Sequence, residues 1–283
     1  MLIRIMTEQD VPDGVRLNTL SGWNQMAADW RRFLDNSPRG CFVMEHDGKV
    51  VGTATTICYE NRFAWIGMVL VDPDYRKQGI GTQLLKRTIE HLDDSNIRTM
   101  KLDATPQGKP LYTKLGFVGE YEIERWILKR PPGAASSIQR SKCVPLNETQ
   151  LERILGLDRE LFGADRTFLL RSLFKETPEY ATAVWDGSPQ GYAFGRRGLF
   201  ADHLGPWMAR DRTTAENILQ GFLSRSSREA LIVDCMKSNV MAVEMLIAHG
   251  FAPARPLTRM VRGPNACPGR PDSFCAILGP EFG

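Results

Sequence analysis

The sequence lacks several features that would place it in a specialised class of protein. No apolar stretch is long enough to span a membrane, and Arg4, Glu8 and Asp10 interrupt any signal peptide near the start. There are only four histidines, and the six cysteines include no C-x-x-C pair. Neither a metal site nor a disulfide framework is therefore expected. These absences predict a cytoplasmic protein that has reduced thiols and does not bind a membrane.

The sequence also lacks a strong charge of either sign. Its net charge of +3 over 283 residues is too small to indicate a nucleic-acid partner. With 42% hydrophobic and 24% charged residues, the composition is typical of a globular protein. The length favours two domains, each able to bury a core of its own.

One segment has the composition of a linker. Residues 131–137 read Pro-Pro-Gly-Ala-Ala-Ser-Ser, which has no side chains suited to a packed core. We therefore expect a first domain over residues 1–130, a linker over 131–139 and a second domain over 140–283.

The first half alternates strand and helix patterns. Strands are predicted over Leu2–Met6, Cys41–Glu45, Val50–Cys58, Ala64–Val71 and Arg98–Ala104, and one or two further strands over Phe117–Leu128. Helices are predicted from Thr7 and over Gln25–Leu34, Gly79–Leu92 and Pro110–Leu115. Asp47-Gly48 between two strand patterns predicts a hairpin. The apolar run that stops at Asp72-Pro73 is typical of a central strand buried on both faces. The fold class expected is α/β, with a mixed sheet flanked by helices.

The second half repeats this order of patterns. It predicts helices over Glu148–Phe162, Thr167–Lys175, Thr214–Ser224 and Val240–Ala248, and strands over Tyr180–Trp185, Gln190–Arg196 and Ala230–Cys235. Leu115-Gly116-Phe117 ends a helix in the first half, and His249-Gly250-Phe251 does so in the second. Each helix follows a strand that ends in aspartate, at Asp103 and Asp234. The halves are therefore interpreted as duplicated units.

The candidate for chemistry is the turn between the strand ending at Val71 and the helix that follows it. Backbone N–H groups in the first turn of a helix lack internal partners and attract phosphate oxygens. Gly79 and Gly81 let the chain approach a diphosphate closely, and Arg76 and Lys77 add positive charge. The alternative is a glycine-capped helix with solvated basic residues, and a short glycine pattern alone would favour that alternative.

The context of this turn carries a resemblance to a known family. Its R-x-x-G-x-G spacing fits neither a P-loop nor a dinucleotide fingerprint. With Leu111-Tyr112 and Gly116-Phe117, similar to an L-Y-x-x-x-G-F segment, it resembles the GNAT superfamily of N-acetyltransferases. The resemblance covers Leu2 to about Lys129 and, with the repeat, implies two tandem GNAT-like domains.

The resemblance implies acetyl-CoA (coenzyme A) as the cofactor. In the family, the strand before the turn contacts the pantetheine arm and the amides of the turn hold the pyrophosphate. The matching positions here are Val69, Leu70, Val71, Arg76, Lys77, Gln78, Gly79, Ile80, Gly81 and Thr82. Tyr112 is implied as the catalytic acid that returns a proton to the departing thiolate. Thr105 and Gly108 stand where the family often has asparagine and alanine.

The same resemblance implies direct attack of a neutral amine on the thioester, which needs a route for the ammonium proton. The apolar strand at Trp65–Val71 has no glutamate, which many relatives place there. Glu60 and Asp103, at strand ends, are the nearest carboxylates, and both are better interpreted as solvated or structural groups.

The acceptor side is expected between the first two helical segments. The family forms one wall of its acceptor pocket there, which makes Trp23, Asn24, Gln25 and Trp30 candidate substrate-binding residues. Packing of the tryptophans between helices and sheet is an equally good interpretation.

The second half keeps the pattern but lacks the chemistry. Asp211–Glu216 stands where a glycine-rich loop is needed, and Leu246 occupies the tyrosine position. We expect a degenerate domain that does not turn over acetyl-CoA and that covers the sheet edge of the first domain or completes its acceptor pocket.

The function expected is acetylation of a primary amine on a small molecule, by a monomer or homodimer. Acetylation of a protein or peptide amine, transfer of a longer acyl chain, and a regulatory acyl-CoA sensor without transferase activity are the alternatives.

Overall fold

The computed structural model describes residues 1–131 and 141–283, so nearly all of the predicted linker at 131–139 lies outside the described residues. The described chain forms two compact units. The first contains Met1–Glu120, Arg259–Ala266 and Phe282, and the second contains Tyr121–Thr258, Cys267–Glu281 and Gly283. No helix in the described part of the chain has both the length and the apolar character needed to cross a bilayer.

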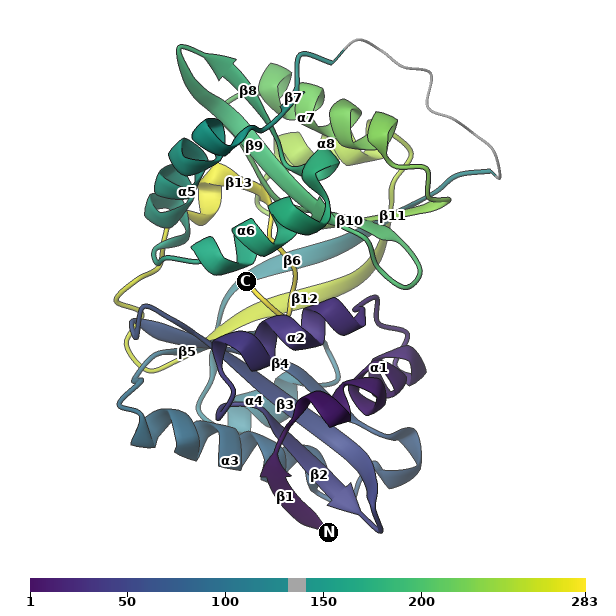
Figure 1. The fold of residues 1–283 in the computed structure, drawn as a ribbon, viewed down its shortest axis with the longest axis vertical. Helices are drawn as coiled ribbons and strands as arrows, with labels where there is room; N and C mark the ends of the chain where they lie inside the picture. The colour runs from purple at the N-terminus through teal and green to yellow at the C-terminus, as the bar shows by residue number, and fades with distance from the viewer. Residues whose placement is uncertain (132–140) are drawn as a thin grey trace. The chain divides into compact units, whose positions relative to one another are not determined.

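The first unit is a mixed sheet flanked by helices. Its strands are β1 (Leu2–Ile5), β2 (Phe42–His46), β3 (Lys49–Tyr59), β4 (Phe63–Val71), β5 (Met100–Ala104) and the end of β12 (Ala252–Arg262), in the spatial order β1-β2-β3-β4-β5-β12. Its helices are α1 (Val11–Leu20), α2 (Ala27–Asn36), α3 (Ile80–Asp94) and α4 (Lys109–Lys114), with short 3-10 turns η1 (Glu8–Asp10) and η2 (Pro73–Tyr75). In Figure 1, α1 and α2 lie in front of the strands of this unit.

The second unit has the same architecture. Its strands are β6 (Val118–Lys129), β7 (Val144–Pro145), β8 (Thr182–Asp186), β9 (Ser188–Arg196), β10 (Asp202–Ala209), β11 (Ala230–Met236) and β13 (Phe274–Ala276), with the first part of β12, in the order β12-β6-β11-β13-β10-β9-β8-β7. Its helices are α5 (Glu148–Phe162), α6 (Thr167–Glu176), α7 (Arg212–Arg225) and α8 (Val240–Ala248), with η3 (Pro178–Tyr180) and η4 (Pro271–Ser273). The predicted fold class, a mixed sheet flanked by helices, is confirmed.

Four strands were not predicted from the sequence, namely β7, β10, β12 and β13, and the first three contain proline. β10 includes Pro206, yet its register with β9 shifts between Leu204 and Trp207, so the proline falls where the ladder is already irregular. β12 includes Pro253 and Pro256 near its start. The pattern over Phe117–Leu128, which allowed one strand or two, is the single strand β6.

Each unit contains a strand segment from the opposite half of the sequence. In the first unit, Arg259 of β12 donates two hydrogen bonds of 2.8 Å to the buried carboxylate of Asp103 in β5. In the second unit, Arg125 of β6 donates hydrogen bonds of 2.8 and 2.7 Å to the buried carboxylate of Asp234 in β11. Bidentate pairing of this kind compensates a carboxylate that is removed from water. Each half of the sequence therefore supplies an arginine that the other half's unit needs.

Candidate active site

Strand β4 leaves its neighbour β5 after a short parallel pairing. The register pairs Ala64 with Met100 and Trp65 with Lys101, and the described ladder has no later pair. On its other edge, β4 remains paired with β3 as far as Val71, through a bulge at Met68, whose φ is 49°. We call the part beyond Trp65, where the strands diverge, the β4–β5 fork. There the backbone of β4 is not engaged by β5.

The turn after β4 adopts a conformation suited to an anion. Lys77 and Gly79 both have positive φ, at 62° and 78°, with one residue between them. A lysine in the left-handed region costs about 1 kcal/mol, so the surrounding turn must hold it there. Gly79 is the N-cap of α3, no side chain caps the helix, and its first turn has no acidic residue. The amides at the start of α3 therefore present uncompensated positive charge.

Gly81 lies in the first turn of α3 without any packing reason to be a glycine. Its φ is not in the left-handed region, and a Cβ added there would come no closer than 3.6 Å to its nearest neighbour, Cγ2 of Val71. That is an ordinary van der Waals distance, so the chain itself leaves room for a methyl group. The space over the helix start is therefore open, as binding of a diphosphate there would require.

Asp72 anchors this turn and was missed in the sequence. Its almost fully buried carboxylate accepts hydrogen bonds from Nη1 of Arg16 at 2.9 Å and from the backbone N–H of Asp74 at 3.2 Å, and Nζ of Lys49 lies at 3.0 Å. Burial alone would raise the pKa of Asp72, but Lys49, Arg16 and the Asp74 amide together lower it. A charged clamp therefore fixes the first residue of the turn. Only the Asp-Pro pair hinted at this in the sequence, and there it indicated no more than the end of a strand.

Tyr112 lies on α4 at the edge of the apolar cluster that also contacts Val69 of β4. Its ring packs edge-on against Phe117, with 6.1 Å between centroids, and a Cβ on Gly108 would come within 2.9 Å of its Cε2. Any side chain larger than hydrogen at position 108 would therefore crowd this ring. Burial raises the pKa of Tyr112 to about 12, so its hydroxyl stays protonated at neutral pH.

The two carboxylates considered as bases have structural surroundings. Asp103 is held by Arg259, whose guanidinium also lies 4.4 Å from the ring of Trp65. Glu60 lies in the turn between β3 and β4 with a φ of 51°, and its carboxylate is 3.8 Å from Nε of Arg62. Among the described residues, no group of three or more His, Cys, Asp or Glu side chains is arranged to hold a metal.

The loop between α1 and α2 holds the predicted acceptor residues, and Asn18 organises it. The amide of Asn18 donates to the backbone oxygens of Gln25 at 3.1 Å and Trp23 at 3.4 Å, and its Oδ1 accepts from the indole of Trp30 at 2.9 Å. Trp30 is fully buried against Gly14, where a Cβ would lie 2.8 Å from the indole. We therefore leave Trp30 out of the acceptor site.

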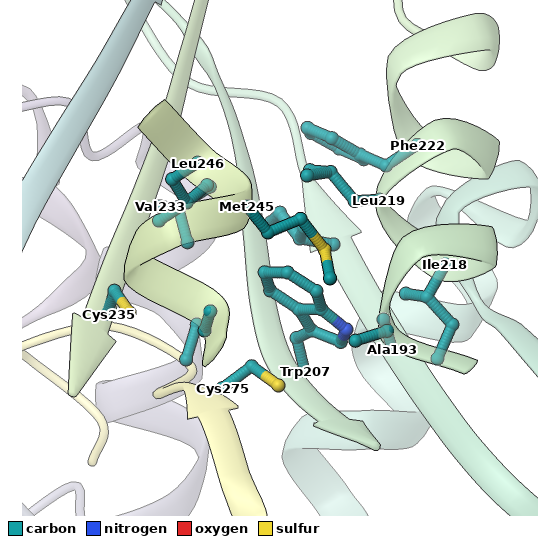
Figure 2. Packing of buried hydrophobic residues seen from close by; sticks show 14 of the residues in the cluster. Ala193, Trp207, Ile218, Leu219, Phe222, Val233, Cys235, Met245, Leu246 and Cys275 are labelled. Atoms are coloured by element: carbon teal, nitrogen blue, oxygen red, sulfur yellow. The ribbon is translucent and has the colours of Figure 1, made fainter. Parts of the chain in front are cut away.

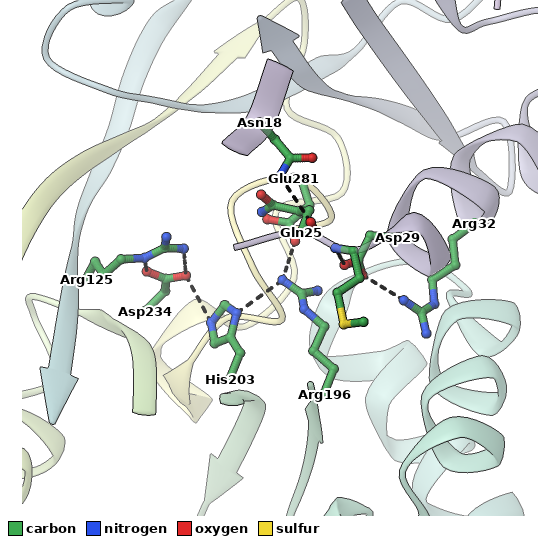
Figure 3. A network of polar contacts seen from close by, with 10 residues as sticks. Asn18, Gln25, Asp29, Arg32, Arg125, Arg196, His203, Asp234 and Glu281 are labelled. Atoms are coloured by element: carbon green, nitrogen blue, oxygen red, sulfur yellow. Dashed lines mark hydrogen bonds and ion pairs between the residues drawn. The ribbon is translucent and has the colours of Figure 1, made fainter. Parts of the chain in front are cut away.

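Gln25 differs from Trp30 in the same loop. Gln25 lies beside Asn18 (Figure 3). Its side chain is only 3% exposed, yet Oε1 has no hydrogen-bond partner among the described residues. A buried amide oxygen without a partner costs roughly 1–3 kcal/mol, so a donor from water or a ligand is expected. Asn24 is buried beside it and Trp23 is half-buried.

Two family models match the chain, one in each half. The acetyltransferase (GNAT) family matches residues 8–117, and an acetyltransferase (GNAT) domain matches residues 154–274. The first span includes the fork, the turn and Tyr112. The second span includes β10, β11 and α7.

Similar proteins include relatives that match most of the chain and relatives that match less than half of it. Holothin acyltransferase from Pseudoalteromonas sp. (strain SANK 73390) is 23% identical, over 92% of this chain and 87% of its own length. Human N-alpha-acetyltransferase 30 is 29% identical over 44% of this chain and 37% of its own length. The crystal structure of a putative acetyltransferase from Pyrococcus horikoshii has a TM-score of 0.83 and 25% identity, and covers 100% of this chain and 95% of that one.

Proposed function

Since the chain belongs to the GNAT acetyltransferase family, we propose that it transfers the acetyl group of acetyl-CoA to a primary amine, at the β4–β5 fork of its first unit. The observation that carries this proposal is the start of α3, uncapped and with a glycine at position 81 that packing does not require. A diphosphate is the ligand that such a helix start suits best.

The residues of the first unit divide the binding of the coenzyme between them. Val69, Leu70 and Val71 lie in the part of β4 that β5 does not pair with, where backbone groups on that edge would suit the amides of a pantetheine arm. The carbonyl of Val71 also accepts a hydrogen bond from Nε of Arg76 at 3.2 Å. The amides of residues 77–82 would hold the pyrophosphate, and Arg76 would add positive charge beside them. Asp72 contributes indirectly, by fixing the turn that orients these amides.

Bound in this way, the coenzyme supplies an acetyl thioester. Tyr112 would keep the proton on its hydroxyl oxygen and donate a hydrogen bond toward the sulfur of the coenzyme. Because its pKa of about 12 lies above the ~8.5 of an ordinary thiol, complete proton transfer to the thiolate is uphill. We therefore assign Tyr112 to stabilising the thiolate as a hydrogen-bond donor, with solvent supplying the last proton. The amine loses its own proton to solvent, since Asp103 is engaged by Arg259.

We propose a small-molecule amine as the acceptor. One relative that spans both halves of this chain is named for holothin, whereas the N-alpha-acetyltransferase matches less than half of it. Oε1 of Gln25 is a buried acceptor that a protonated or neutral amine could satisfy. A peptide N-terminus remains the alternative acceptor, because part of this chain is also similar to an N-alpha-acetyltransferase.

A coenzyme A release assay across a panel of amines tests this function. The panel contains amino acids, polyamines, aromatic amines, aminoglycosides and short peptides, each with acetyl-CoA and with a longer acyl-CoA. We expect release with a small amine and acetyl-CoA. Release with peptides only would move the function to protein acetylation. Tight coenzyme binding without release for any amine would instead indicate a sensor.

A further inference from the structure

The second unit contains strands and a helix equivalent to those of the candidate site, but the space between its strands is filled by the chain itself. β10 and β11 correspond to β4 and β5, and α7 corresponds to α3. β10 and β11 also begin as a short parallel pair, at Asp202 with Leu231, His203 with Ile232 and Leu204 with Val233. Beyond Leu204 they diverge, which gives a β10–β11 fork equivalent to the β4–β5 fork.

Strand β13 lies inside the β10–β11 fork. It pairs antiparallel with β10 at Trp207–Ala276 and Met208–Phe274, and with β11 at Cys235–Ala276. The backbone N–H of Ile277 then donates to the carbonyl of Asp234 in β11 at 3.1 Å. The backbone groups that the fork would offer to a bound pantetheine arm are thus used by the chain itself.

Strand β13 packs tightly in its position between β10 and β11. Its residues Phe274, Cys275 and Ala276 are buried, and Cys275 lies beside Trp207 in the central apolar cluster of this unit (Figure 2). Nδ2 of Asn239, the N-cap of α8, donates to the carbonyl of Phe274 at 3.1 Å. A Cβ on Gly205 of β10 would lie 2.0 Å from the carbonyl oxygen of Ile277, so only glycine admits the segment that follows β13.

The phosphate position is also taken. The N-cap of α7 is Asp211, whose carboxylate accepts from the backbone N–H of Thr214 at 2.7 Å and from its hydroxyl at 3.1 Å. The equivalent N-cap of α3 is Gly79, which has no side chain. A negative charge therefore already occupies the start of α7, and it would repel a second anion there.

We propose that the second unit carries permanent internal substitutes for a coenzyme, with β13 in place of the pantetheine arm and the Asp211 carboxylate in place of a phosphate. The chain then binds one acyl-CoA, in the first unit, and the segment Phe274–Ile277 is a built-in ligand that completes the second core. The location of the one functional site rests on the proposed function, whereas the filling of the second fork does not.

Calorimetric titration of the full chain with acetyl-CoA tests the stoichiometry. We expect one molecule bound per wild-type chain and none per chain of Gly81→Leu, whose side chain intrudes at the start of α3. Two molecules bound by wild type, with one retained by Gly81→Leu, would overturn this inference and leave the proposed function intact. One molecule bound equally by both proteins would contradict both. No binding by either would contradict the proposed function alone, and hydrogen exchange then decides the inference.

Amide hydrogen exchange tests the seat of β13 directly. In wild type, we expect the amides of Ala276 and Ile277 to exchange as slowly as those of β10, with and without acetyl-CoA. Exchange a thousandfold faster than β10, or exchange accelerated by the coenzyme, would show a removable segment and overturn the inference. Gly205→Ala should speed exchange of these amides at least tenfold, whereas Gly156→Ala, in an open position on α5, should not. Unchanged exchange in Gly205→Ala would also count against it.

Discussion

Replacing Gly81 with alanine should stabilise the protein and weaken its hold on the coenzyme. The added Cβ lies at an ordinary 3.6 Å from Val71, and the backbone there is not in the left-handed region. Alanine at a compatible glycine position usually adds about 0.4–1 kcal/mol of stability. The same methyl group occupies the space over the helix start. If it displaces one charge-assisted hydrogen bond to phosphate, about 1.5–3 kcal/mol is lost, which weakens binding roughly ten- to hundredfold.

The two effects are measured by denaturant unfolding of the free protein and by calorimetric titration with acetyl-CoA. Gly156→Ala is the matched control, since a Cβ there meets nothing within 4 Å. It should stabilise the protein by a similar amount with no change in affinity. An unchanged dissociation constant for Gly81→Ala would refute the assignment of the amides at the start of α3. Loss of stability would refute the claim that the chain leaves room for the methyl group.

Three further changes test other parts of the site. Tyr112→Phe should lower kcat about 10²–10³-fold with little change in coenzyme affinity, as for loss of one donor to a developing anion, and equal rates would remove that role. A fragment that ends at Pro131 should be inactive and should give the circular dichroism spectrum of an unfolded chain. Without Arg259, Asp103 is buried without its partner, which destabilises the fold by about 3–5 kcal/mol. A folded, active fragment would contradict this. Because the pKa of Asp72 is lowered in the folded state, its contribution to the unfolding free energy is present above pH ~4 and is lost as the pH falls further. Asp72→Asn should therefore reduce the dependence of the unfolding free energy on acidic pH, measured by denaturant titrations. An unchanged pH dependence would contradict the proposed role of the Asp72 carboxylate.

The elements of the first unit were largely predictable because hydrophobic periodicity and turn residues agree there. The apolar run before Asp72-Pro73 is β4, and the 3.6-residue pattern after Gly79 is α3. In the second unit, the sequence pattern did not predict β10, which contains Pro206, because proline normally argues against a central strand. The bulge that accommodates it depends on the neighbouring strand, which no local pattern shows.

The parts of the site that depend on distant contacts were not predictable. Arg16 precedes Asp72 by more than fifty positions, and sequence spacing does not indicate that they meet. The role of Asn18 likewise needs the folded loop that it bonds to. The sequence does contain one pattern that indicates contacts of this kind. Phe117 is followed by Arg125, and Phe251 is followed by Arg259 at the same spacing. It marks the two arginines that pair with Asp103 and Asp234.

The exchange of strand segments between the halves has a consequence for biosynthesis. A ribosome releases the chain from its N-terminus at roughly 5–20 residues per second. The first unit still needs Arg259–Ala266 and Phe282, so it waits on the order of ten seconds or more after its own strands have emerged. During that time the edge of β5 and the carboxylate of Asp103 lack their partners. Nascent chains should therefore be vulnerable to aggregation and proteolysis until Arg259–Ala266 have emerged, and chaperones that bind unpaired strands would act in that interval.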